Sequence, residues 1–121
     1  MIEIPVVKDL KAAHPVPTVW RETLRRLANA IVGAAPREIV DTLVASDLSG
    51  FRANTAAYGE EFGNLPDQTW ESSLVQWMGN RWDVLVDLFS SRGERTDLVM
   101  FVEVVEGAKG YEFRIDSVHV P

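Results

Sequence analysis

Residues 81–89 read Arg-Trp-Asp-Val-Leu-Val-Asp-Leu-Phe, and this stretch decides the fold. From Trp82 onward, every second residue belongs to the same set: the even-numbered residues are all apolar, and the odd-numbered ones mix apolar residues with aspartates. A repeat of two residues is the period of a β-strand. One face of this strand would carry Trp82 and the two valines, and the other face would carry Asp83, Leu85 and Asp87. Upstream of residue 81 the apolar residues recur at about 3.6 residues, which is typical of helices. The pattern therefore predicts a change from helical to β-structure at this point.

Two further strands are predicted after residue 89, each following a polar loop. Residues 96–106 have apolar side chains on both faces, which is typical of a central strand that is covered on both sides. The loop Gly-Ala-Lys-Gly at 107–110 predicts a hairpin into residues 111–115, where the alternation is regular again. The alternation slips at Asp116 and Ser117, which indicates a bulge or the end of the strand. Residues 81–120 are therefore expected to form a three- to four-stranded antiparallel meander.

The chain before residue 81 is expected to be mainly helical from 18 to 79. Helical spacing of apolar residues predicts helices over 18–32, with Thr18 as the N-cap, over 52–62, and over 67–79, where Trp70, Leu74 and Trp77 share a face. Residues 36–46 fit a helix, because Pro36 suits a first turn and apolar residues follow at helical spacing, but they also fit a strand, because they are rich in β-branched residues. Residues 1–17 contain three prolines and are expected to be an extended lead-in, with a short edge strand at 2–4.

The fold class predicted from this order is α+β, in one domain that covers residues 1–121. The apolar face of a meander needs a cover, so the amphipathic N-terminal helices are expected to pack on that face. No repeat, low-complexity tract or linker divides the chain. The composition, with 46% hydrophobic and 25% charged residues in a chain of 121, is that of an ordinary globular domain.

Composition and charge narrow the classes of function. The chain has no cysteine, which excludes disulfides, thiol nucleophiles and thiolate zinc sites. No signal-peptide pattern is present and no apolar run approaches the ~18 residues that span a bilayer, so the cytoplasm is the expected location. The net charge is −6, and residues 51–121 contain twelve of the 18 acidic residues but only six of the 12 basic ones. This half disfavours nucleic acid and membranes as partners. The simpler interpretation of the acidic excess is solubility alone, and the partner that matches it is a basic protein.

No motif for catalysis, metal binding or a cofactor is present, so none is predicted, and the sequence favours a non-catalytic protein. Only two histidines are available for acid–base chemistry, His14 and His119. His119 would form a polar site with Asp116 or with a carboxylate on the neighbouring strand. A histidine that satisfies a local hydrogen bond at a strand end is the simpler interpretation.

Asp83 and Asp87 place two carboxylates on one otherwise apolar strand face. Four residues of strand separate them by about 13 Å, which is too far for a glycosidase pair at about 5–9.5 Å. They are expected either to pair with arginines of adjacent strands or to line an open polar concavity, and pairing is the favoured interpretation. The candidate arginines are Arg92, Arg95 and Arg114.

The four tryptophans, Trp20, Trp70, Trp77 and Trp82, all lie on predicted apolar faces. Packing in the core is therefore the expected role for most of them. Tryptophan is also a frequent anchor in interfaces, because it combines a large apolar area with a polar edge. Trp70, Trp77 and Trp82 are accordingly candidates for an interaction surface or a pocket.

Several segments resemble a family of small uncharacterised bacterial proteins. They are Tyr58-Gly59, Leu65-Pro66-Asp67-Gln68-Thr69-Trp70-Glu71, the strand Trp82 to Phe89, Gly93-Glu94-Arg95-Thr96-Asp97-Leu98-Val99 and Val118-His119-Val120-Pro121. The family shows Leu-Pro-Asp-x-x-Trp, Trp-x-Val-Leu-Val-Asp-Leu-Trp and Glu-Gly-Arg-Ser-Asp-Leu elements. Phe89 departs from the second element, and the order of residues 93–96 departs from the third. The resemblance covers about residues 58–121 and implies no activity, and Arg95 and Asp97 within it complete the candidate interaction residues.

Three functional hypotheses follow from these patterns. The first is a protein-interaction module of immunity type, whose acidic half meets a basic toxin, because small acidic cysteine-free α+β chains resemble immunity proteins in type. The alternative is a ligand-binding or enzymatic domain, in which tryptophans line a pocket between sheet and helices and Asp83, Asp87 or His119 forms its polar end. Helices that lead into a curved sheet also resemble the cone-shaped fold of nuclear-transport-factor-like proteins, which includes both enzymes and binding modules. A homodimer formed through the sheet is compatible with either hypothesis.

Overall fold

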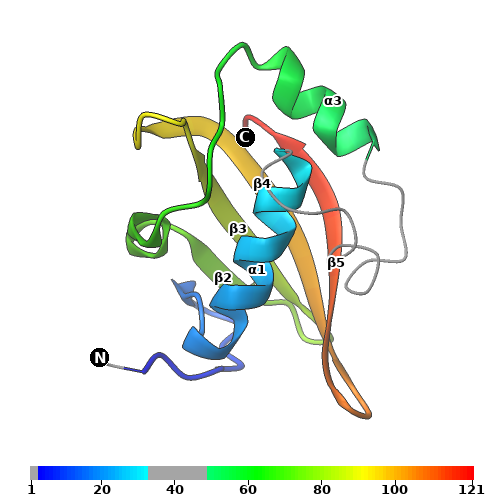
Figure 1. Cartoon of the computed structure of the whole chain (residues 1–121). Helices are drawn as coiled ribbons and strands as arrows, with labels where there is room; N and C mark the ends of the chain where they lie inside the picture. Colours follow the sequence, from blue (N-terminus) through cyan, green and yellow to red (C-terminus); the bar gives the residue numbers. More distant parts are fainter. Residues whose placement is uncertain (1–2, 33–48) are drawn as a thin grey trace.

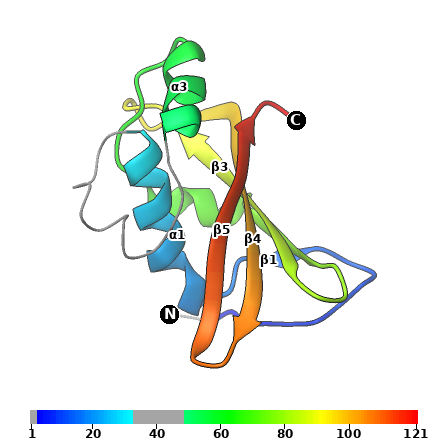
Figure 2. The same cartoon turned by 90° about the vertical axis from the view of Figure 1, so that its right-hand side faces the viewer.

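The computed structural model describes residues 3–32 and 49–121 (Figure 1). The elements, in chain order, are β1 (His14–Pro15), α1 (Thr18–Ile31), α3 (Ser49–Ala57), the 3-10 helix η1 (Asp67–Glu71), β2 (Leu74–Trp77), β3 (Trp82–Phe89), β4 (Arg95–Gly107) and β5 (Gly110–His119). The strands form one antiparallel sheet in the order β1-β2-β3-β4-β5. Helix α1 lies across one face of this sheet, and no helix of the described ranges covers the other face (Figure 2).

The predicted fold class is wrong. The helices of residues 18–79 were expected to cover a three- to four-stranded meander, but the described chain is mostly β-structure, with five strands and two short α-helices. The three strands expected from residue 81 onward are present, and they occupy three neighbouring positions of the larger sheet. The additional strands β1 and β2 come from segments that were expected to be a lead-in and a helix. The ambiguous segment 36–46 lies outside the described residues.

The predicted helix over 67–79 is instead one turn of η1 followed by strand β2. Hydroxyl groups end the helix, because Thr69 Oγ1 donates to the carbonyl of Asp87 at 2.7 Å and Ser73 Oγ accepts from the amide of Asp87 at 3.0 Å. These bonds join the turn to β3, so the chain continues as a strand beside it. The spacing of Trp70, Leu74 and Trp77 suits one helical face, but Leu74 and Trp77 point to opposite faces of the sheet.

The helix predicted over 52–62 is α3, and it ends earlier than expected. Gly59 has a φ of 90°, a left-handed conformation that only glycine adopts without strain. The chain therefore leaves the helix after Ala57, and Phe62 forms an isolated bridge with Ser90 instead of a last helical turn. The predicted N-cap is also wrong, since Thr18 is the first residue of α1 and its Oγ1 accepts a hydrogen bond from the amide of Ile4.

The core lies between α1 and the face of the sheet that it covers. The apolar face predicted for this helix is confirmed, because Trp20, Leu24, Leu27 and Ile31 are all buried. They pack against side chains of the central strands that are equally buried, namely Trp82, Val84, Val86, Leu88, Met100, Val102 and Val104. Rings of Trp82, Tyr111 and Phe113 surround the indole of Trp20 edge to face. This packing assigns one face of each central strand to the interior.

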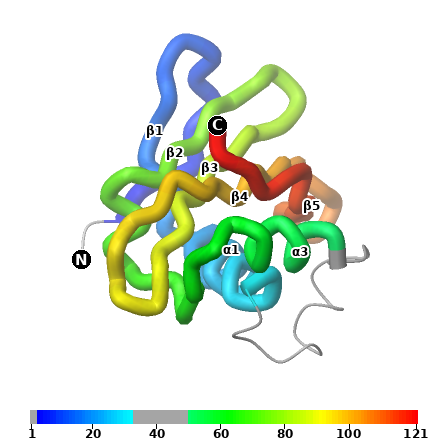
Figure 3. The backbone as a smooth tube through the Cα atoms, turned by 90° about the horizontal axis from the view of Figure 1, so that it is seen from above, coloured from blue at the N-terminus to red at the C-terminus, as the bar shows by residue number. Residues whose placement is uncertain are grey.

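The N-terminal lead-in ends in the edge strand β1, which pairs with β2, and Figure 3 shows the lead-in beside the β2–β3 loop. The carbonyl of Val7 accepts a hydrogen bond from Trp82 Nε1 at 2.8 Å, and the carbonyl of Asp9 accepts one from Gln76 Nε2 at 2.9 Å. His14 Nε2 lies 2.9 Å from Asp9 Oδ2. The expected edge strand at 2–4 is not formed by its described residues, since Ile4 exchanges hydrogen bonds with Thr18.

Candidate functional site

The register of the sheet defines a second face, opposite α1, which we call the open face. Strand alternation turns Trp82 and Val84 towards α1 and turns Asp83 and Leu85 away from it. Cross-strand partners share a face, so the open face consists of Pro15, Leu74, Gln76, Asp83, Leu85, Asp87, Val99, Phe101, Glu103, Val105, Glu112, Arg114, Asp116, Ser117 and His119.

An apolar row crosses the open face. Pro15, Leu74, Leu85 and Phe101 are paired directly from β1 to β4, and Ser117 continues the row on β5. Leu74 is 44% exposed, and Leu85 and Phe101 are partly exposed. The rings of Phe101 and His119 stack with their centroids 4.4 Å apart and their planes 5° apart. The row therefore offers an accessible apolar surface.

A charged row runs beside the apolar one. Gln76, Asp83, Glu103 and Arg114 are paired directly across β2 to β5. Arg114 Nη2 lies 2.6 Å from Glu103 Oε2, while Arg81 Nε lies 3.0 Å from Asp83 Oδ1 and 3.8 Å from Glu103 Oε1. The hydrogen bond and charge of Asp83, with the charge of Glu103, raise the pKa of Arg81. The side chains of Arg81, Asp83 and Glu103 are partly exposed. Ion pairs near the surface contribute only about 0–1 kcal/mol each, so a partner could replace them at little cost in free energy.

A hollow of about 180 Å³ lies where the two rows meet. Its lining includes Arg81, Asp83, Leu85, Phe101, Glu103 and Asp116. The predicted slip at Asp116 is confirmed as a bulge, because Phe101 pairs with Ser117 whereas Val102 pairs with Ile115. The bulge leaves Asp116 without a partner across the strand, beside the hollow.

The open face carries an excess of negative charge. Its carboxylates are Asp83, Asp87, Glu103, Glu112 and Asp116. Its guanidinium groups are Arg114 and, at the end of the β2–β3 turn, Arg81. The carboxylates therefore outnumber the guanidinium groups, and five of the twelve acidic residues of 51–121 lie on this face, beside an apolar surface.

The predicted polar residues do not form one cluster, although three of them lie on the open face. Asp83 pairs with Arg81 instead of Arg92, Arg95 or Arg114, and the cross-strand arginine pair forms at Glu103. Asp87 Oδ2 accepts a hydrogen bond from Ser72 Oγ at 2.5 Å. Arg95 and Asp97 are exposed at the start of β4, where the amide of Asp97 donates to the hydroxyl of Tyr58 at 3.1 Å. Of the predicted residues, Asp83, Asp87 and His119 share the open face.

The candidate tryptophans lie in or beside the core, away from the open face. Trp82 is 1% exposed and Trp70 is 8% exposed, with the guanidinium of Arg21 5.5 Å from the Trp70 ring. Trp77 is half-buried on the α1 side, with its ring 4.5 Å from that of Trp82. Because successive strand residues face opposite ways, Trp82 and Asp83 do not line the same cavity. The structure therefore does not bring the tryptophans and aspartates together in one pocket.

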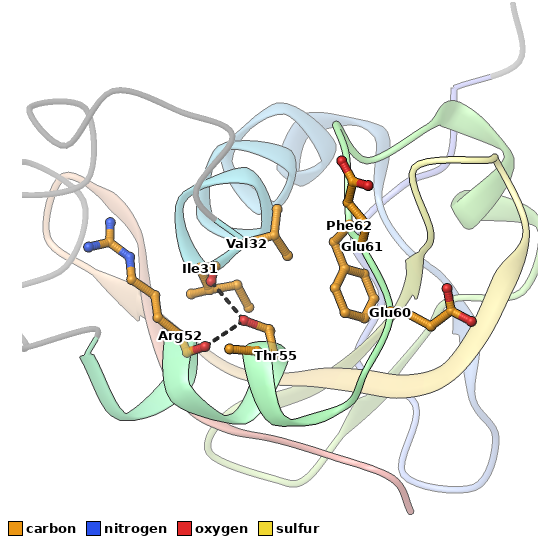
Figure 4. A pocket seen from close by; sticks show the side chains of 8 residues that line it. Ile31, Val32, Arg52, Thr55, Glu60, Glu61 and Phe62 are labelled. Atoms are coloured by element: carbon orange, nitrogen blue, oxygen red, sulfur yellow. Dashed lines mark hydrogen bonds between the residues drawn. The ribbon is translucent and has the colours of Figure 1, made fainter.

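A second hollow, of about 310 Å³, lies between the end of α1 and α3 (Figure 4). Its polar groups connect the two helices. Thr55 Oγ1 shares its one proton between the carbonyls of Ile31, at 3.1 Å, and Arg52, at 2.8 Å, and Arg52 Nε donates to the carbonyl of Ala30 at 3.1 Å. The bonds to Ile31 and Ala30 satisfy the last carbonyls of α1, which lack partners within the helix. The bonded polar groups of this hollow therefore have a structural role.

Sequence reasoning missed several residues of the open face, including Leu74, Leu85, Phe101 and Glu103. The strand over 96–106 was expected to be covered on both faces, but Phe101 and Val105 remain partly exposed. The sequence did contain one signal for this face. Carboxylates alternate with apolar residues at 83–87, and this pattern is typical of a strand face that is open to solvent as well as of one with paired charges. Within the described ranges, no group of three or more His, Asp and Glu side chains is arranged to hold a metal ion, and no helix is long and apolar enough to cross a membrane.

Comparison with known proteins gives one finding. A family model described as a domain of unknown function (DUF7668) matches residues 33–121. No curated protein and no solved structure matches the chain. The predicted resemblance to an uncharacterised family is therefore confirmed at the level of the family, while the individual motifs and the bacterial origin stay predictions.

Proposed function

We propose that this chain, which belongs to the DUF7668 family, is a non-catalytic protein-interaction module whose open face binds a basic protein. One observation carries the proposal: the open face joins an exposed apolar row to an excess of carboxylates. The apolar row supplies area for burial, and the carboxylates select a partner of opposite charge and accelerate its approach.

The dimensions of the open face support a protein partner over a small molecule. Pockets for small ligands usually enclose about 300–1,000 Å³, whereas the hollow beside Phe101 has about 180 Å³. The remainder of the face is spread over five strands. A surface spread over five strands is contacted fully only by another extended surface.

The charge of the open face also argues against pairing with a second copy. Face-to-face association would bring two sets of five carboxylates together, with only two guanidinium groups on each side to offset them. Like charges placed opposite each other in an interface are destabilising. The partner that fits is therefore a different, basic protein, and the chain by itself is expected to be a monomer.

Within this class, we propose an immunity-type role in the cytoplasm, in which the module covers a basic surface of a toxin. A protein that acts on nucleic acid needs such a basic surface to hold phosphates. An acidic module bound there would prevent access of the substrate. The support for this role is the acidic excess of residues 51–121 together with the lack of catalytic motifs in the sequence.

The test is capture of the partner with a charge-reversed variant and a matched control. Asp116→Lys with Glu112→Lys reverses two exposed carboxylates of β5, and Glu60→Lys with Glu61→Lys makes the same change of charge beside α3. The unchanged chain and the control are expected to capture one basic protein from the source cells. Once that protein is purified, calorimetry should give one-to-one binding that the β5 variant weakens at least tenfold.

Two results would contradict the proposal. The first is that no basic protein binds the purified chain in a one-to-one ratio. The second is that the β5 variant binds the partner as tightly as the control does, because contact with the open face would then be unnecessary.

A further inference from the structure

We infer that the partner's anchoring residue is an arginine, whose guanidinium group enters the hollow between Asp83, Glu103 and Asp116 and whose aliphatic part lies against Leu85 and Phe101. This inference rests on the proposed function and adds the chemistry of the contact. It follows from three features of the hollow: its carboxylates, which are not saturated, its apolar wall, and the guanidinium groups of Arg81, which lines it, and Arg114, which pairs with Glu103.

The carboxylates of the hollow retain acceptor capacity. An ionised carboxylate has about four lone-pair sites. Asp83 has one ion pair among the described residues, with Arg81, and Glu103 has two, with Arg81 and Arg114. Asp116 forms no ion pair within the described part of the chain, and the bulge places it at the rim. An incoming cation would therefore meet acceptors that are not saturated.

The apolar side of the hollow suits the stem of a long basic side chain. Leu85 and Phe101 line it, and both are partly exposed. Arginine and lysine bury their methylene groups along such surfaces while the charged end stays among polar groups. His119 already stacks on the Phe101 ring, so the incoming side chain would lie against the part of Phe101 that lines the hollow. Guanidinium groups stack on aromatic rings in the same manner.

Arginine fits the hollow better than lysine does. A guanidinium group is planar and donates in a fork that reaches two carboxylates together, whereas an ammonium group is a compact and strongly hydrated charge. The chain already uses this chemistry, because the guanidinium groups of Arg81 and Arg114 both lie within 4 Å of Glu103, at 3.8 Å and 2.6 Å. The same row of carboxylates is therefore arranged for guanidinium donors.

The experiment is an NMR titration of the full ¹⁵N-labelled chain with three small probes: N-acetyl-arginine amide, its neutral isostere N-acetyl-citrulline amide, and N-acetyl-lysine amide. The arginine probe is expected to shift the amides of Leu85, Phe101 and Asp116 with a saturable dissociation constant in the millimolar range. Citrulline should bind at least tenfold more weakly, and lysine should bind more weakly than arginine. Asp116→Asn should weaken arginine binding about fivefold, whereas Glu60→Gln should leave it unchanged.

The inference is overturned if citrulline binds as well as arginine does, if the shifts spread equally to Glu60 and Glu61, or if Asp116→Asn has no effect. These outcomes are distinct from failure of the proposed function. Capture of a basic protein without specific arginine binding would reject the anchor and keep the interaction module. Specific arginine binding without any protein partner would keep the hollow as a guanidinium site and reject the module.

Discussion

Replacement of Leu24 by alanine tests the packing of α1 on the sheet. Leu24 is 0% exposed and belongs to the core cluster that joins α1 to the central strands. Removal of a fully buried leucine side chain down to alanine costs about 2–5 kcal/mol, from lost burial and from the cavity that remains. A domain of this size unfolds with a free energy of about 5–15 kcal/mol. Leu24→Ala is therefore expected to remove a large part of the stability of the fold.

The assay is urea unfolding followed by tryptophan fluorescence, which reports on the buried indoles of Trp20 and Trp82. The matched control is Val19→Ala, because Val19 lies in the same helix and is 61% exposed. The control is expected to change the free energy of unfolding by less than about 0.5 kcal/mol. Equal losses for both variants, or a loss below about 1 kcal/mol for Leu24→Ala, would refute the packing of this helix face into the core.

Three further predictions concern the domain boundary, pH and assembly. Residues 33–121 alone, the part matched by the family model, should stay unfolded by circular dichroism, since they lack α1; a cooperative thermal transition would contradict this. The hydrogen bond from His14 lowers the pKa of Asp9 below its ordinary 3.8, so this carboxylate stabilises the fold above about pH 4, and the contribution is lost as the pH falls through the lowered pKa. Asp9→Asn should therefore reduce the loss of stability on acidification relative to Asp97→Asn, and identical acid unfolding curves would reject the link. Light scattering at tens of micromolar and low salt should give a monomer, whereas a dimer would argue against repulsion between open faces.

The periodicity of the sequence predicted an element correctly where that element has a single, regular pattern. The alternation in residues 82–89 predicted β3, and the spacing of Trp20, Leu24, Leu27 and Ile31 predicted the buried face of α1. The slip at Asp116 predicted a bulge or the end of the strand, and the structure has the bulge, which borders the hollow. In each case the signal is the periodicity of one element, which does not depend on its neighbours.

The same reasoning failed at residues 67–79, where two periodicities overlap. Trp70, Leu74 and Trp77 match a helical face, but Val75 and Trp77 also match one face of a strand. The choice between them is made by two hydrogen bonds with the backbone of Asp87, a residue that is distant in the sequence: Thr69 donates to its carbonyl and Ser73 accepts from its amide. Such bonds are tertiary contacts, and no local propensity contains them.

The sequence by itself determined the strands from residue 82 onward, the buried face of α1 and the excess of acidic over basic residues in 51–121. Only the tertiary structure decided which face of the sheet is interior, because β4 carries apolar residues on both faces, Met100 and Val102 on one and Val99 and Phe101 on the other. The described chain places α1 on the first of these faces. Phe101 and the carboxylates beside it are consequently left at the surface, where the proposed partner would bind.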